Sequence, residues 1–413
     1  MPTRVCFVSL NAYPAINPAA GKNIGGLEST AWRLAKHLAS DSRFEVSMVV
    51  RHNQPIPDPI VQNVRLLPIV DRFRDRRLRV SKRLEVQSSF PWLKVKSWSW
   101  SLPWNITVLL LTRWFRDRRE TSSRIFEVLD QANADALVCL GNGNDPQSTI
   151  QFGKQKQIPC MLLLQSNSDV DERYFQDDNF VNAFGEPASA CRFVLENVEM
   201  VVGQTQWQSD LVSRVVERSA EHLPTPVDSD SWQPSDSGSR EFVLWIGRYD
   251  RFHKRPELAF QIAQLCPSLK FIFVINECDP EVEAELRQKV PENAEVVDYV
   301  RKDEMPALMR NAKVFLSTGS ADFEGLPNVF LEAASSGTPI VSLNDFGEFI
   351  SNSSGGFDVG DDVEIAADRI KLLCDDTAIW RQHSDSGRDW ISKHHAIDPV
   401  IEQFKRLIEK LLA

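Results

Sequence analysis

Residues 324–332 read EGLPNVFLE and place two glutamates eight positions apart, around a glycine, a proline and an apolar run. Val314 to Leu316, shortly before them, have the composition of a buried strand, and a loop of small residues follows. We therefore expect Glu324 in a loop at the carboxyl end of a strand and Glu332 about two turns into the following helix. Ligands bind at this edge of an open α/β sheet, so the stretch predicts a site with a carboxylate at each end.

The chain on both sides of this stretch alternates short apolar runs with helical patterns. In residues 25–39, for example, the apolar residues recur at helical spacing. Strands that alternate with helices predict an α/β fold with two Rossmann-like, doubly wound parallel sheets. The runs expected to form strands are residues 4–10, 44–50, 136–140, 160–164 and 200–203, followed by 241–247, 270–275, 294–300, 313–318 and 339–343.

A segment near the middle of the chain has the composition of a linker. Residues 224–240 are rich in Pro, Ser and Asp and nearly free of core residues. A chain of 413 residues is long enough for two domains, each with its own core. We predict an N-terminal domain of residues 1–228, a linker of residues 229–240, a C-terminal domain of residues 241–396 and an amphipathic terminal helix of residues 397–413.

Composition argues against several classes of function. The net charge of -10 is wrong for a general nucleic-acid binder. The seven cysteines form no CxxC pair and the seven histidines no HExxH pattern, so we expect a reducing cytoplasm, no disulfide framework and no metal site. We expect His394 and His395 on the solvated surface. We expect no signal peptide and no membrane span, because the longest apolar run, near Val108 to Leu111, is far too short to cross a bilayer.

Residues 72–119 differ from the rest of the chain. They hold thirteen Lys or Arg residues against three acidic ones, and five of the eleven tryptophans. Basic residues interleaved with Trp suit an anionic membrane surface, where Trp rests at the headgroups and the cations meet lipid phosphates. The same composition fits an acceptor groove in which Trp stacks on sugars, or an insertion with a plain solvated face. The residues alone leave these three interpretations open.

A second cluster of charges follows the strand expected at residues 241–247. Arg248 lies at the end of that strand, and Lys254 directly precedes a helix that begins near Pro256. Two fixed cations at a strand edge beside a helix N-terminus can clamp a diphosphate. Taken alone, an Arg and a Lys in a loop are more often surface charges.

The opening stretch offers complementary groups. Amides after Gly325 can point at phosphate oxygens from the first turn of a helix, and Pro327 pre-sets that turn. Glu332 is placed to accept hydrogen bonds from two ribose hydroxyls, and Glu324 from those of a hexose. Each glutamate alone could equally be a structural carboxylate.

Taken together, these pieces resemble the retaining glycosyltransferases of glycosyltransferase family 4, which have the glycosyltransferase-B fold. The resemblance covers nearly the whole chain. It rests on GGLE at residues 25–28, LPTPVD at 223–228, GRYD with the later Lys at 247–254, and EGLPNVFLEAASSGTPIVS at 324–342. It implies that the terminal helix crosses back onto the N-terminal domain, and that the C-terminal domain binds a nucleotide sugar.

The resemblance also implies roles for single residues. Arg248 and Lys254 would bind the donor diphosphate, and Glu324 would contact the donor sugar near the reacting carbon, which makes these three the implied catalytic residues. Glu332 would hold the ribose. The remaining implied donor-binding positions are Gly25, Gly26, Gly247, Tyr299, Val300, Gly325, Leu326, Pro327, Asn328 and Val329.

The sequence departs from the family in the N-terminal domain. Many relatives carry a His at the end of a strand there, facing the donor sugar, whereas this chain offers Gln165 after one strand and Asn142 and Asn144 after another. We therefore assign Gln165, Asn142 and Asn144 to the acceptor side.

From the resemblance we expect a retaining hexosyltransferase. It would move a sugar from a nucleoside-diphosphate sugar to a hydroxyl of a glycan or glycolipid, in bacterial cell-surface polysaccharide or glycoconjugate synthesis. We expect no cofactor, no metal and no nucleic-acid partner. The expected place is the cytoplasm, with peripheral binding to an anionic membrane on its inner face. The alternative is a catalytically silent relative that binds a nucleotide sugar or acts as an assembly partner.

Overall fold

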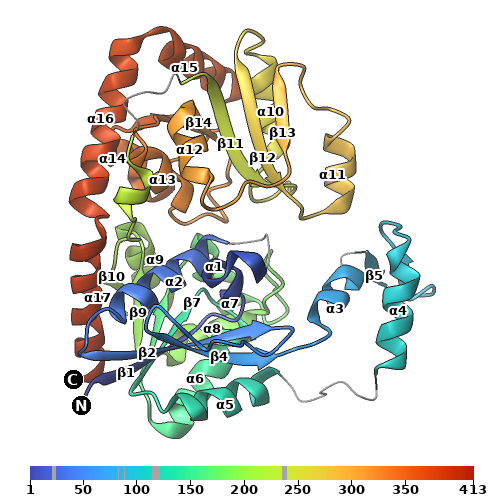
Figure 1. Ribbon diagram of the computed structural model, residues 1–413, viewed down its shortest axis with the longest axis vertical. Coiled ribbons are helices and arrows are strands. Elements are labelled where there is room, and N and C mark those ends of the chain that lie inside the picture. The colour runs from blue at the N-terminus through green and yellow to red at the C-terminus, as the bar shows by residue number, and fades with distance from the viewer. Residues whose placement is uncertain (21–24, 82, 88, 114–120, 235–239) are drawn as a thin grey trace.

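Two α/β units, each built on its own sheet, make up the fold (Figure 1). The structure is a computed structural model that describes residues 1–20, 25–81, 83–87, 89–113, 121–234 and 240–413. Residues 114–120 of the basic, Trp-rich region and residues 235–239 of the predicted linker therefore lie outside the described residues.

The first sheet has eight strands in the order β10-β9-β8-β7-β1-β2-β4-β3. Its central strands are buried along their length because helices cover both faces, which explains their continuous apolar runs. The strands are β1 Thr3–Val8, β2 Phe44–His52, β3 Ile60–Val61, β4 Val64–Val70, β7 Ala136–Leu140, β8 Cys160–Leu163, β9 Met200–Gly203 and β10 Glu221–His222. The helices are α1 Tyr13–Ile16, α2 Gly26–Leu38, α5 Thr121–Ala132, α6 Asn144–Lys156, α7 Arg173–Gln176, α8 Ala188–Asn197 and α9 Gln206–Val216.

The edge of this sheet departs from the predicted all-parallel pattern. β3 pairs antiparallel with β4, whereas the other strand pairs of the sheet are parallel. The turn between them is formed by Gln62 and Asn63, which both have positive φ angles, 49° and 65°. Two left-handed residues match the twist of a tight hairpin. The sequence interpretation missed this hairpin because neither position is a glycine.

The second sheet has six strands in the order β13-β12-β11-β14-β15-β16, all of them parallel. Its strands are β11 Phe242–Arg248, β12 Lys270–Asn276, β13 Ala294–Val297, β14 Ala312–Ser317, β15 Ile340–Ser342 and β16 Gly356–Asp358. Its helices are α10 Pro256–Gln264, α11 Pro280–Leu286, α12 Met305–Asn311, α13 Asn328–Ser335, α14 Phe349–Ser353, α15 Val363–Asp375 and α16 Thr377–His394.

In each sheet the crossover connections between parallel strands change direction at one place. The reversal lies between β1 and β7 in the first sheet and between β11 and β14 in the second. Loops after neighbouring strands diverge at such a switch point and leave room for a ligand at the carboxyl edge. The sequence motifs after β11 and β14 are therefore brought to the switch point of the second sheet.

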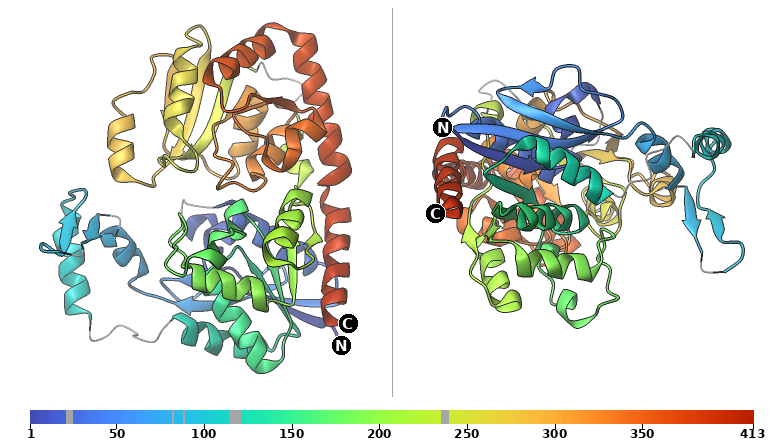
Figure 2. Two further views of the ribbon diagram at one scale, coloured as in Figure 1. Left: turned by 180° about the vertical axis from the view of Figure 1, so that it is seen from behind. Right: turned by 90° about the horizontal axis from the view of Figure 1, so that it is seen from below.

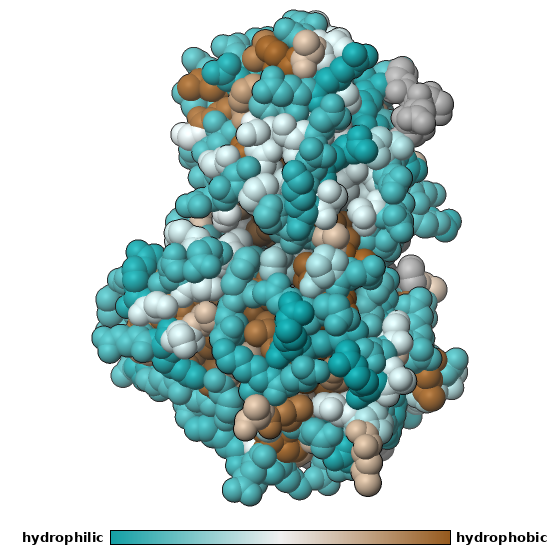
Figure 3. Space-filling model, turned by 90° about the vertical axis from the view of Figure 1, so that its left-hand side faces the viewer, coloured by the Kyte–Doolittle hydropathy of each residue, from teal (hydrophilic) through white to brown (hydrophobic). Residues whose placement is uncertain are grey.

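The last helix, α17 Ile397–Leu412, returns from the second unit to pack on the first (Figure 2). Phe404 is fully buried, and its ring lies 6.0 Å from that of Phe7 on β1. The buried apolar stripe of α17 therefore completes the core of the N-terminal unit. The face formed by α16 and α17 is mainly hydrophilic, with two lobes that meet at a waist (Figure 3).

The expectation of a surface site for the adjacent histidines is wrong for His395. Its side chain is buried, and Nδ1 lies 2.9 Å from the carbonyl oxygen of Thr225. Burial lowers the pKa of His395 to about 4, so the ring is neutral. The residue lies where α16 gives way to α17, beside the crossover between the units, and this long-range packing is invisible in the local sequence.

The basic, Trp-rich insertion forms an arm that projects from the N-terminal unit (Figures 1 and 2). We call its described residues between 72 and 113 the arm. It consists of α3 Arg74–Ser81, the hairpin β5 Leu84–Val86 and β6 Leu93–Val95, and α4 Ser101–Leu111. Among the described residues, no helix is long and apolar enough to cross a membrane.

Candidate active site

The two motifs that follow β11 and β14 meet at the switch point of the second sheet. Arg248 is the last residue of β11, and Lys254 lies in the loop that leads to α10. Glu324 lies in the loop that leads from β14 to α13. The Lys254 ammonium forms an ion pair with the Glu324 carboxylate, which joins the two loops.

Glu324 is a buried carboxylate held by two side chains. It is 8% exposed, and beside Lys254 it contacts His253, with Nε2 of the ring 2.8 Å from Oε1. Burial by itself raises the pKa of Glu324, but the neighbouring Lys254 and His253 outweigh it and hold the pKa at about 2. The group is therefore a fixed negative charge at neutral pH.

His253 connects Glu324 to Arg248. Arg248 Nη2 lies 2.7 Å from Nδ1 of the ring, and a guanidinium can only donate. Nδ1 must therefore accept, so Nε2 carries the proton that is donated to Glu324. His253 was not singled out in the sequence, although its position next to Lys254 was the available signal.

Asp250 holds this loop in place by hydrogen bonds. Its carboxylate is 3% exposed and accepts from Arg248 Nε at 2.5 Å. It also accepts from the backbone N–H groups of His253 and Lys254 at 2.7 and 2.8 Å. One buried acid thus holds both the Arg248 side chain and the loop backbone that carries His253 and Lys254.

Gly325 allows the loop after β14 to touch the N-terminal unit. A Cβ atom at this position would lie 2.9 Å from the carbonyl oxygen of Gln165 and 2.9 Å from Nε2 of Gln208. The next residue, Leu326, donates its N–H to Oε1 of Gln204 at 3.2 Å and buries its side chain. The predicted phosphate-facing amide of Leu326 is thus engaged by the opposite domain in this structure.

Helix α13 begins directly after Pro327, the proline that the sequence placed at the start of this helix. Pro327 is its N-cap residue and Asn328 its first residue, while Val329 packs against the core of the second unit. The Asn328 side-chain amide donates to the carbonyl oxygen of Gly26 at 2.9 Å and to Oγ1 of Thr30 at 3.3 Å. The N-terminus of α13 therefore meets the N-terminus of α2.

The glycines at the start of α2 have different surroundings. Gly25 is the N-cap residue, and a Cβ there would lie 2.2 Å from Oε2 of Glu28. At Gly26 the nearest atom to such a Cβ is Nδ2 of Asn328, at 3.1 Å. Burial raises the pKa of Glu28, and Arg248 acts against this rise from across the domain boundary. These contacts bring Gly25 and Gly26 to the same region as Arg248.

Gly247 has an explanation in packing. A Cβ there would lie 2.3 Å from the Trp245 indole, because residues two apart on a strand share a face. Trp245 is fully buried and donates Nε1–H to Oγ1 of Thr318 at 2.9 Å. Gly247 thus makes room for the ring that ties β11 to the loop after β14.

Glu332 is the fifth residue of α13, so it lies just over one turn into the helix and not about two. Burial raises its pKa to about 7, and Arg33 of α2 and Lys302 act against that rise. Lys302 follows β13 closely, as do Tyr299 and Val300. Arg33 and Lys302 were not identified from the sequence, because their proximity to Glu332 depends on how the two units meet.

The three residues assigned to the acceptor side follow strands of the first sheet. Asn142 donates its side-chain amide to the carbonyl oxygens of Asp169 at 2.8 Å and Cys191 at 3.2 Å. Asn144 donates its side-chain amide to Oε2 of Glu186 at 2.5 Å. The contacts of these two asparagines are thus within the N-terminal unit. Gln165 alone lies against the loop of Gly325.

Asp169 is a further residue that sequence reasoning missed. Its buried carboxylate accepts from the backbone N–H groups of Gln165 at 2.6 Å, Ser166 at 2.9 Å and Asn142 at 3.1 Å. Burial raises the pKa of Asp169 to about 6 against these hydrogen bonds. The acid shapes the loops after β7 and β8, which face the second unit.

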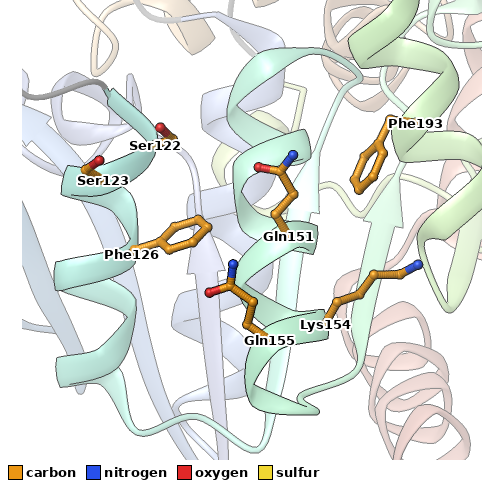
Figure 4. A pocket seen from close by; sticks show the side chains of 7 residues that line it. All are labelled: Ser122, Ser123, Phe126, Gln151, Lys154, Gln155 and Phe193. Carbon is orange, nitrogen blue, oxygen red and sulfur yellow. The ribbon is translucent and has the colours of Figure 1, made fainter.

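One groove of the N-terminal unit lies away from this cluster. A groove of about 470 Å³ between α5, α6 and α8 is lined by Ser122, Ser123, Phe126, Gln151, Lys154, Gln155 and Phe193 (Figure 4). None of the predicted site residues lines it. Gln165 and Gln204 line a second cavity, of about 10 Å³, which has room for about one water molecule and is lined by residues of the N-terminal unit. The two units contact each other at the candidate site through the hydrogen bonds of Leu326 and Asn328 described above.

Within the described ranges, no group of three or more His, Cys, Asp or Glu side chains could hold a metal ion. The cations of the candidate site are side chains of the protein, Arg248 and Lys254, at the carboxyl edge of the sheet.

Residues 240–376 match the family model described as glycosyl transferases group 1. This segment is a glycosyltransferase domain. It contains Arg248, Lys254, Glu324 and Glu332, so the clustered residues of the candidate site all belong to the matched segment. A comparison with curated proteins finds no match.

Solved structures resemble the chain over its full length. Sucrose-phosphate synthase from Thermosynechococcus elongatus has a TM-score of 0.69 and 14% identity, and the match covers 99% of each chain. A mutant of S. aureus TarM, in complex with fondaparinux, α-GlcNAc-glycerol and UDP, has a TM-score of 0.69 and 13% identity over 98% of this chain and 99% of that chain. Anabaena HepE with UDP and glucose has a TM-score of 0.68 and 13% identity over 99% and 100%. The chain therefore has the glycosyltransferase-B fold of two Rossmann-like domains, which confirms the predicted fold class.

Proposed function

We propose that the protein is a retaining glycosyltransferase of family 4 that moves a sugar from a nucleoside-diphosphate sugar to a hydroxyl of a glycan or glycolipid. The observation that carries the proposal is the position of Glu324, ion-paired with Lys254 at the switch point of a glycosyltransferase domain and facing the N-terminal loops. The complexes of TarM and HepE contain UDP, which supports a nucleotide donor for this fold. The proposed setting is bacterial cell-surface polysaccharide or glycoconjugate synthesis.

In the proposed donor complex, Arg248 and Lys254 hold the diphosphate beside the N-terminus of α13. Both cations are already oriented, Arg248 by Asp250 and Lys254 by Glu324, so little side-chain entropy remains to be lost when phosphate binds. Backbone N–H groups at the start of α13 add a positive helix end. Glu332, one turn further on, accepts hydrogen bonds from the ribose hydroxyls.

The proposed reaction is a front-face displacement at the anomeric carbon. The bond from that carbon to the diphosphate oxygen breaks, and a bond to the acceptor oxygen forms on the same face. The departing phosphate accepts the acceptor's hydroxyl proton. Arg248 and Lys254 stabilise the negative charge that develops on the leaving diphosphate, which is the main catalytic demand of such a step. Because side chains supply this positive charge, we propose that no metal or cofactor is needed.

The contact between the domains suits this chemistry, because hydrolysis of the donor competes with transfer. The loop after β14 bonds to the N-terminal unit through Leu326 and Asn328, and the Asn167 side-chain amide donates to the carbonyl oxygen of Ala321 at 3.1 Å. Closure of this kind excludes water and brings both substrates into place.

The proposed acceptor is a glycan that is free or linked to a lipid. A lipid-linked acceptor places the enzyme in the cytoplasm, at the inner face of an anionic membrane.

The donor site is tested by thermal unfolding against UDP-, GDP- and ADP-sugars. A ligand at about 100 times its dissociation constant adds roughly 2.7 kcal/mol, so one nucleotide class should raise the melting temperature of the wild type by a few degrees. The rise should be much smaller in Glu332→Gln. Glu295→Gln is the matched control, since this exposed glutamate forms a surface ion pair with Lys270 at 3.0 Å and lies outside the candidate site. Equal shifts in Glu332→Gln and the control would refute the ribose assignment.

Catalysis is tested by transfer with the donor so identified. Lys254→Gln and Glu324→Gln should each lower the transfer rate by at least about 100-fold, in line with the loss of a charged contact to the transition state. Near-wild-type rates would refute the assignment. Donor binding without transfer to any glycan or lipid-linked acceptor would favour the silent relative over the enzyme.

A further inference from the structure

The arm exposes apolar side chains on a scale not found elsewhere among the described residues. Ten of their nineteen large exposed apolar side chains lie on it. Trp100 is 91% exposed and Phe90 81%. The most exposed are Phe90, Trp92, Trp98, Trp100, Trp104 and Leu111. Such a patch on a folded chain indicates a binding surface.

The fold itself explains why no other described part of the chain covers this surface. Helix α4 packs on α3, and only Leu102 and Asn105 of its eleven residues are buried. The hairpin of β5 and β6 forms a two-stranded sheet of its own, and the side chains of Leu93, Lys94 and Val95 are all exposed. Figure 2 shows the arm standing clear of both units in two directions.

The charge of the arm is opposite to that of the chain. It carries nine described Lys or Arg residues against Asp75 and Glu85, in a protein of net charge -10. The cations alternate with the apolar residues, as in β6, where Leu93 and Val95 point to one face and Lys94 to the other. A partner that suits this pattern has an apolar layer for the exposed aromatic and aliphatic side chains and anionic groups for the neighbouring Lys and Arg residues.

We propose that the arm docks on the surface of an anionic lipid bilayer, with its tryptophans at the level of the headgroups and its Lys and Arg residues on lipid phosphates. Indole rings prefer this interface, and each basic residue near an anionic surface contributes about 1 kcal/mol. Helix α4 is about 16 Å long, from eleven residues at about 1.5 Å each, so it lies in the interface and does not cross it.

This inference names the partner surface of the proposed enzyme, and only its biological purpose rests on the proposed function. The arm extends from the side of the N-terminal unit after β4, and its upper end in Figure 1 reaches the level at which the two units meet. A bilayer that binds this end of the arm lies at the level where the units meet, and there the loop after β14 meets Gln165. A lipid-linked acceptor could then reach the candidate site without leaving the membrane.

The charge of the arm favours a bilayer over a second copy of the chain as the partner that binds it. Two arms that pack on each other bring like charges together, which is unfavourable, whereas an anionic bilayer is complementary. The exposed apolar residues also extend along both a hairpin and a helix, a spread that suits a planar surface.

The test is co-flotation of the full chain with vesicles of phosphatidylglycerol and phosphatidylcholine, against phosphatidylcholine alone. The wild type should bind the anionic vesicles and bind neutral vesicles at least tenfold more weakly. Trp100→Ala combined with Trp104→Ala should lower binding to anionic vesicles at least tenfold. The apolar control is Leu265→Ala with Ile365→Ala, because both residues are exposed outside the arm.

A second variant tests the charge. Arg79→Gln with Lys94→Gln and Lys96→Gln should weaken binding about 100-fold, at about fivefold for each cation. Lys270→Gln with Lys289→Gln and Lys371→Gln removes the same charge from exposed positions of the C-terminal domain and should bind as the wild type. Brominated lipid should quench the Trp fluorescence of the wild type, and this quenching should be much weaker in the variant that lacks Trp100 and Trp104.

Three outcomes would overturn the inference. They are equal binding to both vesicle types, binding that is unchanged in the arm variants, and a wild type that sediments as a dimer which the arm variants dissociate. Loss of transfer to a water-soluble acceptor in the Trp variant would instead assign the arm to an acceptor groove. Vesicle binding needs no donor, so failure of the proposed activity leaves this result intact.

Discussion

Replacement of Glu332 by Gln should stabilise the protein at high pH and weaken donor binding. Glu332 lies on α13, and burial raises its pKa to about 7 from the model-compound value of 4.5. A carboxyl whose pKa is higher in the folded than in the unfolded state costs no stability below pH 4.5. Stability is then lost as the pH rises through 7, because the folded protein must ionise a group that prefers its proton.

The magnitude follows from that difference in pKa. With a pKa of about 7 in the folded protein against 4.5 in the unfolded chain, this carboxyl lowers the free energy of unfolding by about 3 kcal/mol at pH 8 and by less than about 1 kcal/mol at pH 5. Glutamine has nearly the shape of the protonated acid, so Glu332→Gln removes this cost. The variant should therefore gain about 2 kcal/mol on the wild type between pH 5 and pH 8.

Donor binding should have the opposite pH dependence to stability, because it should become stronger as the pH rises. Ribose hydroxyls donate hydrogen bonds to the ionised carboxylate and favour that form, so donor binding needs Glu332 deprotonated. With a pKa of about 7, only about one tenth of the free protein has the carboxylate at pH 6, and the dissociation constant should rise about tenfold between pH 8 and pH 6.

The assay is chemical denaturation of the wild type and Glu332→Gln at pH 5 and pH 8, with donor titrations over the same range. Glu295→Gln, an exposed acid, is the control for a change of charge alone. The reasoning is refuted if the difference in stability between Glu332→Gln and the wild type is the same at both pH values. A donor dissociation constant that is the same at pH 6 and pH 8 in the wild type would refute the assignment of Glu332 to the ribose hydroxyls.

Three further substitutions test other parts of the structure. Phe404→Ala should cost about 3–5 kcal/mol, measured by denaturation, because a fully buried ring leaves a cavity; a cost below 1 kcal/mol would mean that α17 is not part of the N-terminal core. His253→Ala should lower kcat about 10- to 100-fold with donor affinity little changed, since it removes hydrogen bonds to two charged groups; an unchanged kcat would leave His253 without a positioning role. Gly325→Ala should open the domain contact, because its Cβ meets the Gln165 carbonyl oxygen at 2.9 Å; small-angle scattering identical to that of the wild type would contradict this.

Much of the fold was accessible from sequence because it depends on local patterns. The apolar runs at residues 44–50 and 270–275 lie within β2 and β12, and the amphipathic pattern from residue 397 marks α17. Alternating strands and helices favour one family of topologies, since parallel strands need crossovers. The hairpin at Gln62 and Asn63 was not predicted from the sequence, because no glycine marks its left-handed turn.

The candidate site was accessible only in part. The spacing of Glu324 and Glu332 and the pair Arg248 and Lys254 pointed to the carboxyl edge of a sheet, and the structure brings Glu324 and Lys254 into contact. The roles of these residues stay predictions. The groups that hold these residues in place, such as Asp250, which accepts hydrogen bonds from the loop backbone, could be identified only from the structure.

The sequence by itself determined which segments form strands and helices and which charged side chains follow them, because both depend on residues within a few positions of each other. Only the tertiary structure decided what those side chains touch. Arg33 approaches Glu332, Gln165 limits residue 325, and His395 is buried, through contacts between residues far apart in the chain. Such contacts are set by the packing of two domains and a returning helix, and the burial they create shifts pKa values in ways that no local pattern records.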